Sequence, residues 1–150
     1  MANSTGSLWL LWGALAATVP TWLAMPGLVM PRSSPWYDAQ TAVAGFVLAI
    51  LALVAGIGTF AARESLVLRD VREGRIDPRT PAGMIQLRVG LGAIWLLCAL
   101  IGAFGALMAY YSARPAVGWP YIAGSAVLFA LHAPRGRFLR SIFEPSAQRG

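Results

Sequence analysis

The run "AVAGFVLAILALVAGIGTF", residues 42–60, contains no charged residue and no regular alternation of apolar and polar positions. A helix of about 20 apolar residues spans the hydrocarbon core of a bilayer. A strand of a membrane β-barrel instead alternates apolar and polar residues over about ten positions. The run therefore predicts a transmembrane α-helix.

The same kind of run recurs along the chain. Of the 150 residues, 57% are hydrophobic and 12% are charged, and that charged share is about half of the usual one in soluble domains. Apolar blocks cover residues 8–29, 41–62, 89–110 and 117–133, the last being the shortest. The predicted fold is an all-α polytopic membrane protein, with four transmembrane helices (two hairpins) in a single domain over residues 1–150.

The distribution of arginine predicts the orientation of these helices. Six arginines lie at or near the second-to-third connection and four follow the last block, against one in each of the other two connections. Because basic residues collect on the cytoplasmic side, both termini and the loop 63–83 are predicted to be cytoplasmic. The first block has no basic segment before it and is too long for a signal peptide, so we expect it to remain as a span. The absence of lysine is typical of a GC-rich bacterial gene. For a bacterial protein with these spans, we expect a location in the plasma (inner) membrane.

The connection "RESLVLRDVREGRIDPRTPAG", residues 63–83, is the longest polar stretch. We expect a helical continuation of the second span, with Arg69 paired to Glu73 one turn on, and a left-handed stop at Gly74. Ser34-Pro35 and Thr80-Pro81 each place a capping side chain before a proline, which is typical of a helix start.

The tail 134–150 is predicted to form a short amphipathic helix in the cytoplasmic interface, with arginines opposite Phe138 and Ile142. Anionic lipid headgroups or a protein partner would dock on the basic side chains of the loop and the tail. The docking candidates are Arg69, Arg72, Arg75, Arg79, Arg137 and Arg140.

The apolar blocks carry little that points to chemistry. No charged residue lies in the middle of any of them, although ion and proton pathways usually need one. We predict no catalytic residue and no metal site, since Cys98 is a lone cysteine and Asp38 reads as a helix-end residue. No cofactor is predicted. His132, otherwise read as an interfacial residue, and Trp22, beside a kink at Pro20, are the candidates if haem, quinone or pigment is shared with a partner subunit.

Small residues recur at four-residue spacing, which lets helix backbones approach closely. The pairs are Gly13 and Ala17, Ala52 and Gly56, Ala99 and Ala103, Gly102 and Ala106, and Ala126 and Ala130. Because every span carries such a pair, we expect at least one face to pack against another copy or another membrane subunit.

These features together predict a non-enzymatic membrane protein, an accessory or assembly subunit of a larger complex or a homo-oligomer. Membrane lipids and a membrane protein are the expected partners, and nucleic acid is not. One alternative is a small oligomeric transporter or channel. A second is a lipid- or quinone-handling enzyme that uses the arginine-rich loop as a headgroup clamp.

Overall fold

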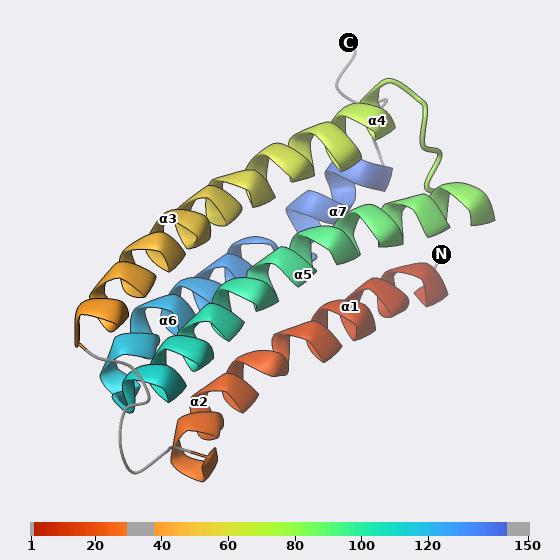
Figure 1. Cartoon of the computed structure of the whole chain (residues 1–150). Helices are drawn as coiled ribbons and strands as arrows, with labels where there is room; N and C mark the ends of the chain where they lie inside the picture. The colour runs from red at the N-terminus through yellow and green to blue at the C-terminus, as the bar shows by residue number, and fades with distance from the viewer. Residues whose placement is uncertain (1, 30–37, 144–150) are drawn as a thin grey trace.

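The computed structural model describes residues 2–29 and 38–143, and every regular element in those ranges is a helix. The elements are α1 (Ala2–Ala16), α2 (Thr18–Val29), α3 (Asp38–Arg63), the π-helical turn η1 (Glu64–Leu68), α4 (Arg69–Arg72), α5 (Pro81–Ser112), α6 (Pro115–Leu131) and α7 (Gly136–Phe143). The all-α prediction is confirmed (Figure 1).

Three helical segments are long and apolar enough to cross a membrane, namely Gly6–Ala24, Ala39–Arg72 and Pro81–Ser112. The fourth apolar helix, Pro115–Leu131, has 17 residues and is shorter. Three of the four predicted spans thus have the length and composition that a membrane crossing requires.

Helix α5 is the centre of the bundle, and α1, α2, α3 and α6 all pack against it (Figure 1). Its side chains Leu87, Ile94 and Trp95 are completely buried. Helices α1 and α2 lie along α5 on the side away from α3. The prediction of two packed hairpins is thus right for α5 and α6. It is wrong for the first hairpin, because α1–α2 and α3 each pack on α5 and not on each other.

The backbones of α5 and α6 approach each other closely at Gly105 and Gly118. A Cβ atom added to Gly105 would stand 2.6 Å from the carbonyl oxygen of Gly118. Only glycine permits two helix backbones to come this close. This crossing was not among the predicted small-residue pairs, because its two members lie on different helices and no spacing in the sequence connects them.

Side-chain donors to backbone carbonyls connect the helices. The hydroxyl of Ser125 in α6 donates to the Cys98 carbonyl in α5 at 2.6 Å, and that of Tyr121 donates to the Gly45 carbonyl in α3 at 2.9 Å. The indole of Trp12 in α1 donates to the Phe129 carbonyl in α6 at 3.1 Å. Each bond adds directional specificity to surfaces that are otherwise apolar, at about 0.6 kcal/mol on average in membrane proteins.

The predicted kink at Pro20 is confirmed. Helix α1 ends at Ala16 and α2 begins at Thr18, since a proline cannot donate the hydrogen bond that residue 16 would accept. Two threonine hydroxyls bind neighbouring carbonyls at the break: Thr18 donates to Leu15 at 2.6 Å and Thr21 donates to Ala17 at 3.1 Å.

The connection 63–83 is mostly helical, and the predicted helical continuation of the second apolar block is confirmed. The helical rod runs from α3 through η1 and α4 as far as Arg72, and Gly74 follows with φ +76°. The cap at Thr80 accepts a hydrogen bond from the Gly83 amide, and α5 begins at Pro81, not at residue 89. Hydropathy marks only the lipid-compatible part of a helix, whereas the cap marks where the helix begins. Ser34-Pro35 lies outside the described residues.

The tail forms the predicted amphipathic helix, α7, but its apolar side packs on the bundle. Phe138 and Ile142 are buried in one core cluster with Val67 and Val71 of the η1–α4 segment. The expectation of a helix lying in the lipid interface is corrected accordingly. Val67 packs against Gly90 of α5, while Val71 lies beside Ile142 and Phe143 of α7.

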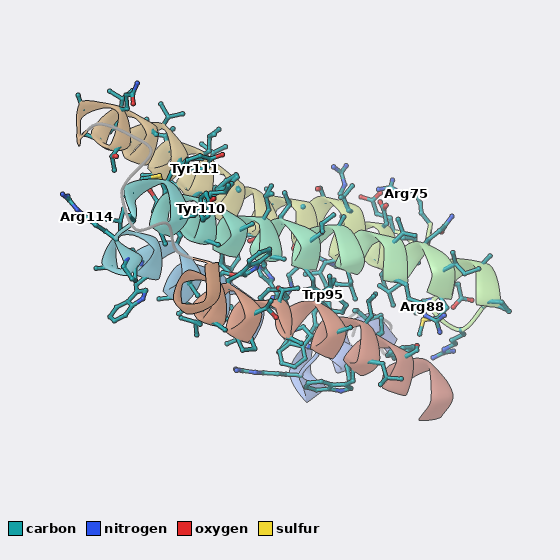
Figure 2. All side chains as sticks on the ribbon, turned by 60° about the horizontal axis from the view of Figure 1, so that its bottom comes forward. Arg75, Arg88, Trp95, Tyr110, Tyr111 and Arg114 are labelled. Atoms are coloured by element: carbon teal, nitrogen blue, oxygen red, sulfur yellow. The ribbon has the colours of Figure 1, made fainter. Side chains whose placement is uncertain are left out.

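The start of α1, the α4–α5 turn and α7 lie at the same end of the bundle (Figure 1). We call this the Arg-rich end and define it by residues 63–80 and 132–143. Figure 2 shows Arg75 and Arg88 toward this end, and Tyr110, Tyr111 and Arg114 at the other. The two ends of the bundle are therefore chemically distinct.

Replacing Gly105 by alanine tests the α5–α6 crossing. The added methyl group meets backbone, which cannot yield as a side chain does, so G105A is expected to lower the free energy of unfolding by about 1–3 kcal/mol. The matched control is G124A in α6, where an added Cβ has no neighbour within 4 Å. Unfolding in mixed micelles, followed by circular dichroism, measures both. Equal stabilities would contradict the crossing.

Candidate functional site

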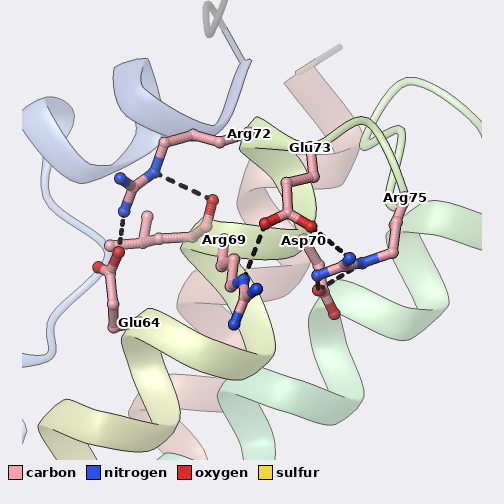
Figure 3. A network of polar contacts seen from close by, with 7 residues as sticks. Glu64, Arg69, Asp70, Arg72, Glu73 and Arg75 are labelled. Carbon is pink, nitrogen blue, oxygen red and sulfur yellow. Dashed lines mark hydrogen bonds and ion pairs between the residues drawn. The ribbon is translucent and has the colours of Figure 1, made fainter.

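The exposed surface of the Arg-rich end carries a network of ion pairs (Figure 3). The Nε atom of Arg69 lies 2.8 Å from Glu73 Oε1, and Arg75 Nε lies 2.9 Å from Asp70 Oδ1. Arg72 pairs with Glu64, and Arg75 also reaches Glu73. The predicted pair between Arg69 and Glu73 is confirmed.

The network is internally neutral. Between residues 64 and 75 there are three arginines and three acids, and each arginine contacts an acid of the same segment. The hydrogen bond from Arg69 holds the pKa of the Glu73 carboxyl below its usual value. Exposed pairs of this kind contribute little to stability, because water and salt screen the attraction between their charges. What they provide is an ordered surface carrying both signs of charge.

The remaining docking candidates are divided between the turn and α7. The guanidinium of Arg79 donates to the carbonyl of Phe143 at 3.4 Å, and the Arg79 amide donates to Asp77 Oδ1 at 2.9 Å. Arg79 therefore connects the turn to α7. The side chains of Arg137 and Arg140 lie outside the described part of the chain.

Two further arginines point inward. The guanidinium of Arg63 lies 4.3 Å from the centre of the Phe138 ring, a cation–π contact that connects α3 to α7. The Nε atoms of Arg63 and Arg88 are buried and have no hydrogen-bond partner among the described residues. Neither arginine was a predicted docking residue, and the structure places both at the inner side of the Arg-rich end.

His132 is buried, with 3% of its surface exposed, so the expectation of an interfacial residue is wrong. Its Nε2 atom lies 2.9 Å from the hydroxyl of Thr59 in α3, and that hydroxyl donates its hydrogen to the Gly56 carbonyl at 2.7 Å. The Thr59 oxygen therefore acts as acceptor, and the Nε2 atom of His132 must carry the hydrogen. Its Nδ1 atom is then an acceptor, and it has no partner among the described residues.

The backbone of His132 is also engaged. The indole of Trp95, which is completely buried in α5, donates to the His132 carbonyl at 3.0 Å. Thr59 and Trp95 were not recognised as partners in the sequence. The sequence did contain a signal for Thr59. It is a polar residue at the end of the apolar run 42–60, and His132 lies at the corresponding end of the apolar block 117–133.

Trp22 lies against the middle of α5. A Cβ added to Gly102 would stand 2.8 Å from Trp22 Cδ1 and 3.1 Å from Ser125 Oγ. The indole nitrogen of Trp22 is buried without a partner in the described ranges. Gly102 is seven residues beyond Trp95, which is about 10 Å along a helix. Trp22 and His132 thus contact α5 at different depths and are not brought together.

The predicted small-residue pairs have mixed outcomes. Ala99, Gly102 and Ala106 are buried in the bundle, and Gly56 faces Leu128 of α6. Gly13 has nothing within 4 Å of an added Cβ, and Ala126 and Ala130 are exposed. Most of these faces therefore close the bundle itself, while the α1 and α6 pairs remain on its surface.

In residues 2–29 and 38–143, no three His, Cys, Asp or Glu side chains come together as a metal site would require. The described part of the chain thus holds a charged surface and a buried polar cluster at the same end. Comparison of the chain with protein families, curated proteins and solved structures found no match.

Replacing Thr59 by valine tests the buried hydrogen bond to His132. The change keeps the shape and removes the acceptor, so the Nε2 hydrogen of His132 is left buried and unpaired, at a cost of about 1–3 kcal/mol. T59S keeps the hydroxyl and is the matched control. Unfolding in mixed micelles followed by tryptophan fluorescence gives both stabilities, and T59V as stable as T59S would show that the bond contributes nothing.

Proposed function

We propose that the chain is a bacterial plasma-membrane protein that crosses the bilayer four times and acts without catalysis, as an accessory or assembly subunit of a larger membrane complex or as a homo-oligomer. Three spans have the required length and composition. The fourth, α6, would span about 25 Å at 17 residues, so it stands upright or thins the bilayer locally.

The outer face of α3 carries this proposal. In the most apolar stretch of the helical rod 39–72 only 6% of the residues are buried, as in Gly6–Ala24, against 56% in α5. Large apolar side chains follow one another along its whole length, at Val43, Phe46, Val47, Ile50, Leu51, Leu53, Val54, Ile57 and Phe60. Helix α3 packs on the bundle with one side only. The large side chains on its other side can interdigitate with those of a second helix.

The charged segment beyond this face favours a protein partner over lipid. The same rod continues into the neutral ion-pair network of Glu64, Arg69, Asp70, Arg72, Glu73 and Arg75. Its acids would repel an anionic headgroup layer, whereas alternating signs are typical of a docking face between proteins. We therefore assign Arg69, Arg72 and Arg75 to protein docking, and not to a lipid clamp.

The Arg-rich end is proposed to be cytoplasmic, from the excess of arginine there. For a test, single cysteines replace Gly74 and Arg114 in a Cys98→Ser background. In intact cells an impermeant maleimide is expected to label Arg114→Cys, and to label Gly74→Cys only after the membrane is opened. Labelling of Gly74→Cys from outside would invert the orientation.

A photo-crosslinking residue at Val54 tests docking along α3. It is expected to give one discrete protein adduct, whose mass identifies a second copy or another membrane subunit. The control is the same residue at Val127 of α6, which is similarly exposed at 57% against 62% for Val54. Adducts with lipid alone at both positions, together with a monomer in mild detergent at every concentration, would refute the proposal.

A further inference from the structure

A groove of about 490 Å³ runs along the outside of the bundle between α1–α2 and α6. Its lining includes Trp9, Trp12 and Pro20 on one wall, Ala126 and Ala130 on the other, and Arg135. The volume falls within the range of about 300–1,000 Å³ that is common for small-molecule sites. Apart from Arg135, the groove is almost entirely apolar.

The groove is built into the packing of the helices. Ala126 and Ala130 carry only methyl groups, so the α6 wall is shallow. The indole of Trp12 donates to the Phe129 carbonyl at 3.1 Å, which fixes α1 to α6 within the lining. The ring of Trp9 meets that of Trp12 edge-on, with 5.4 Å between centroids. Aromatic rings held in this way form a preorganised wall for an aliphatic chain.

The groove has a direction. Arg135 follows α6 at the Arg-rich end, and Trp9 lies in the first half of α1, whereas Pro20 and Ala126 lie deeper in the bundle. A ligand that fits must therefore be polar at one end and apolar along the rest. Tryptophan and arginine at such a level are typical of the headgroup region of a bilayer.

The charge at the mouth specifies the polar end. Arg135 is exposed and makes no ion pair with any described carboxylate. The described acids of the Arg-rich end already have other contacts, because Glu64, Asp70 and Glu73 pair with arginines and Asp77 accepts from the Arg79 amide. The Arg135 guanidinium, which no carboxylate of the described residues neutralises, is thus complementary to an anion placed at the end of an apolar chain.

We propose that this groove is a binding site for one acidic phospholipid, with an acyl chain between α1–α2 and α6 and its phosphate at Arg135. The inference rests on the membrane insertion proposed above and not on docking along α3. It assigns lipid binding to a different face and a different arginine from the predicted loop arginines.

Native mass spectrometry of the detergent-purified full chain, titrated with phosphatidylglycerol or phosphatidylcholine, tests the site. One phosphatidylglycerol is expected to bind in preference to phosphatidylcholine. Arg135→Gln is expected to weaken it by about fivefold, since one arginine near an anionic surface contributes about 1 kcal/mol. Ala130→Phe fills the groove and is expected to abolish the preference. Arg114→Gln at the opposite end and Val127→Phe outside the lining are the matched controls, and all variants are first checked for helicity.

The outcomes separate the possible occupants. Equal binding of the two lipids, or equal loss in Arg114→Gln and Arg135→Gln, would overturn the proposal. Loss in Ala130→Phe with no effect of Arg135→Gln would indicate an apolar ligand such as a quinone and would also overturn it. A dimer mass that disappears in Ala130→Phe would show that the groove holds a second copy. None of these results depends on the photo-crosslinks at Val54, so the two proposals fail separately.

Discussion

The constraint on which this structure depends is that backbone polar groups in an apolar environment must find partners within the protein. Helices satisfy almost all of them, and side-chain hydroxyls add further hydrogen bonds to backbone carbonyls. At the Pro20 break the hydroxyls of Thr18 and Thr21 bind adjacent carbonyls. Between helices the polar side chains Trp12, Trp95, Tyr121 and Ser125 all donate to backbone carbonyls. These four side chains of the apolar helices therefore hold neighbouring helices together.

The same constraint explains why α5 is central. Its glycines allow α6 to approach at Gly105 and Trp22 to lie against Gly102, while its large residues fill the remaining space. Helix α3 has the opposite character, with small residues such as Gly45 and Gly56 toward the bundle and large ones outward. One helix is thus surrounded by its own chain, and the other presents most of its length to whatever lies outside.

The basic side chains of the Arg-rich end have different partners on its surface and in its interior. On the surface, each of Arg69, Arg72 and Arg75 has a carboxylate from the same segment. Inside, Arg63 rests on the Phe138 ring and His132 shares a hydrogen bond with Thr59. Arg135 has neither a carboxylate nor an aromatic partner among the described residues. The proposed lipid site therefore differs in charge from the proposed protein-docking face, whose arginines are paired.

The sequence by itself determined the helical class and three helices long and apolar enough to cross a membrane. It also determined the break at Pro20, the stop at Gly74 and the start at Thr80-Pro81. These features depend on hydropathy, on a missing amide hydrogen or on a local cap, all of which act within a few residues. Tertiary structure alone decided that α1 and α2 pack on α5 and that α7 joins the core cluster of Val67 and Val71. It also decided that His132 is buried against Thr59 and that α6 crosses α5 at Gly105 and Gly118. Each of these contacts joins segments far apart in the chain. A uniformly apolar helix has no polar face, so its sequence does not indicate which side turns inward. Only the mutual fit of side chains and of close-approaching glycines makes that choice.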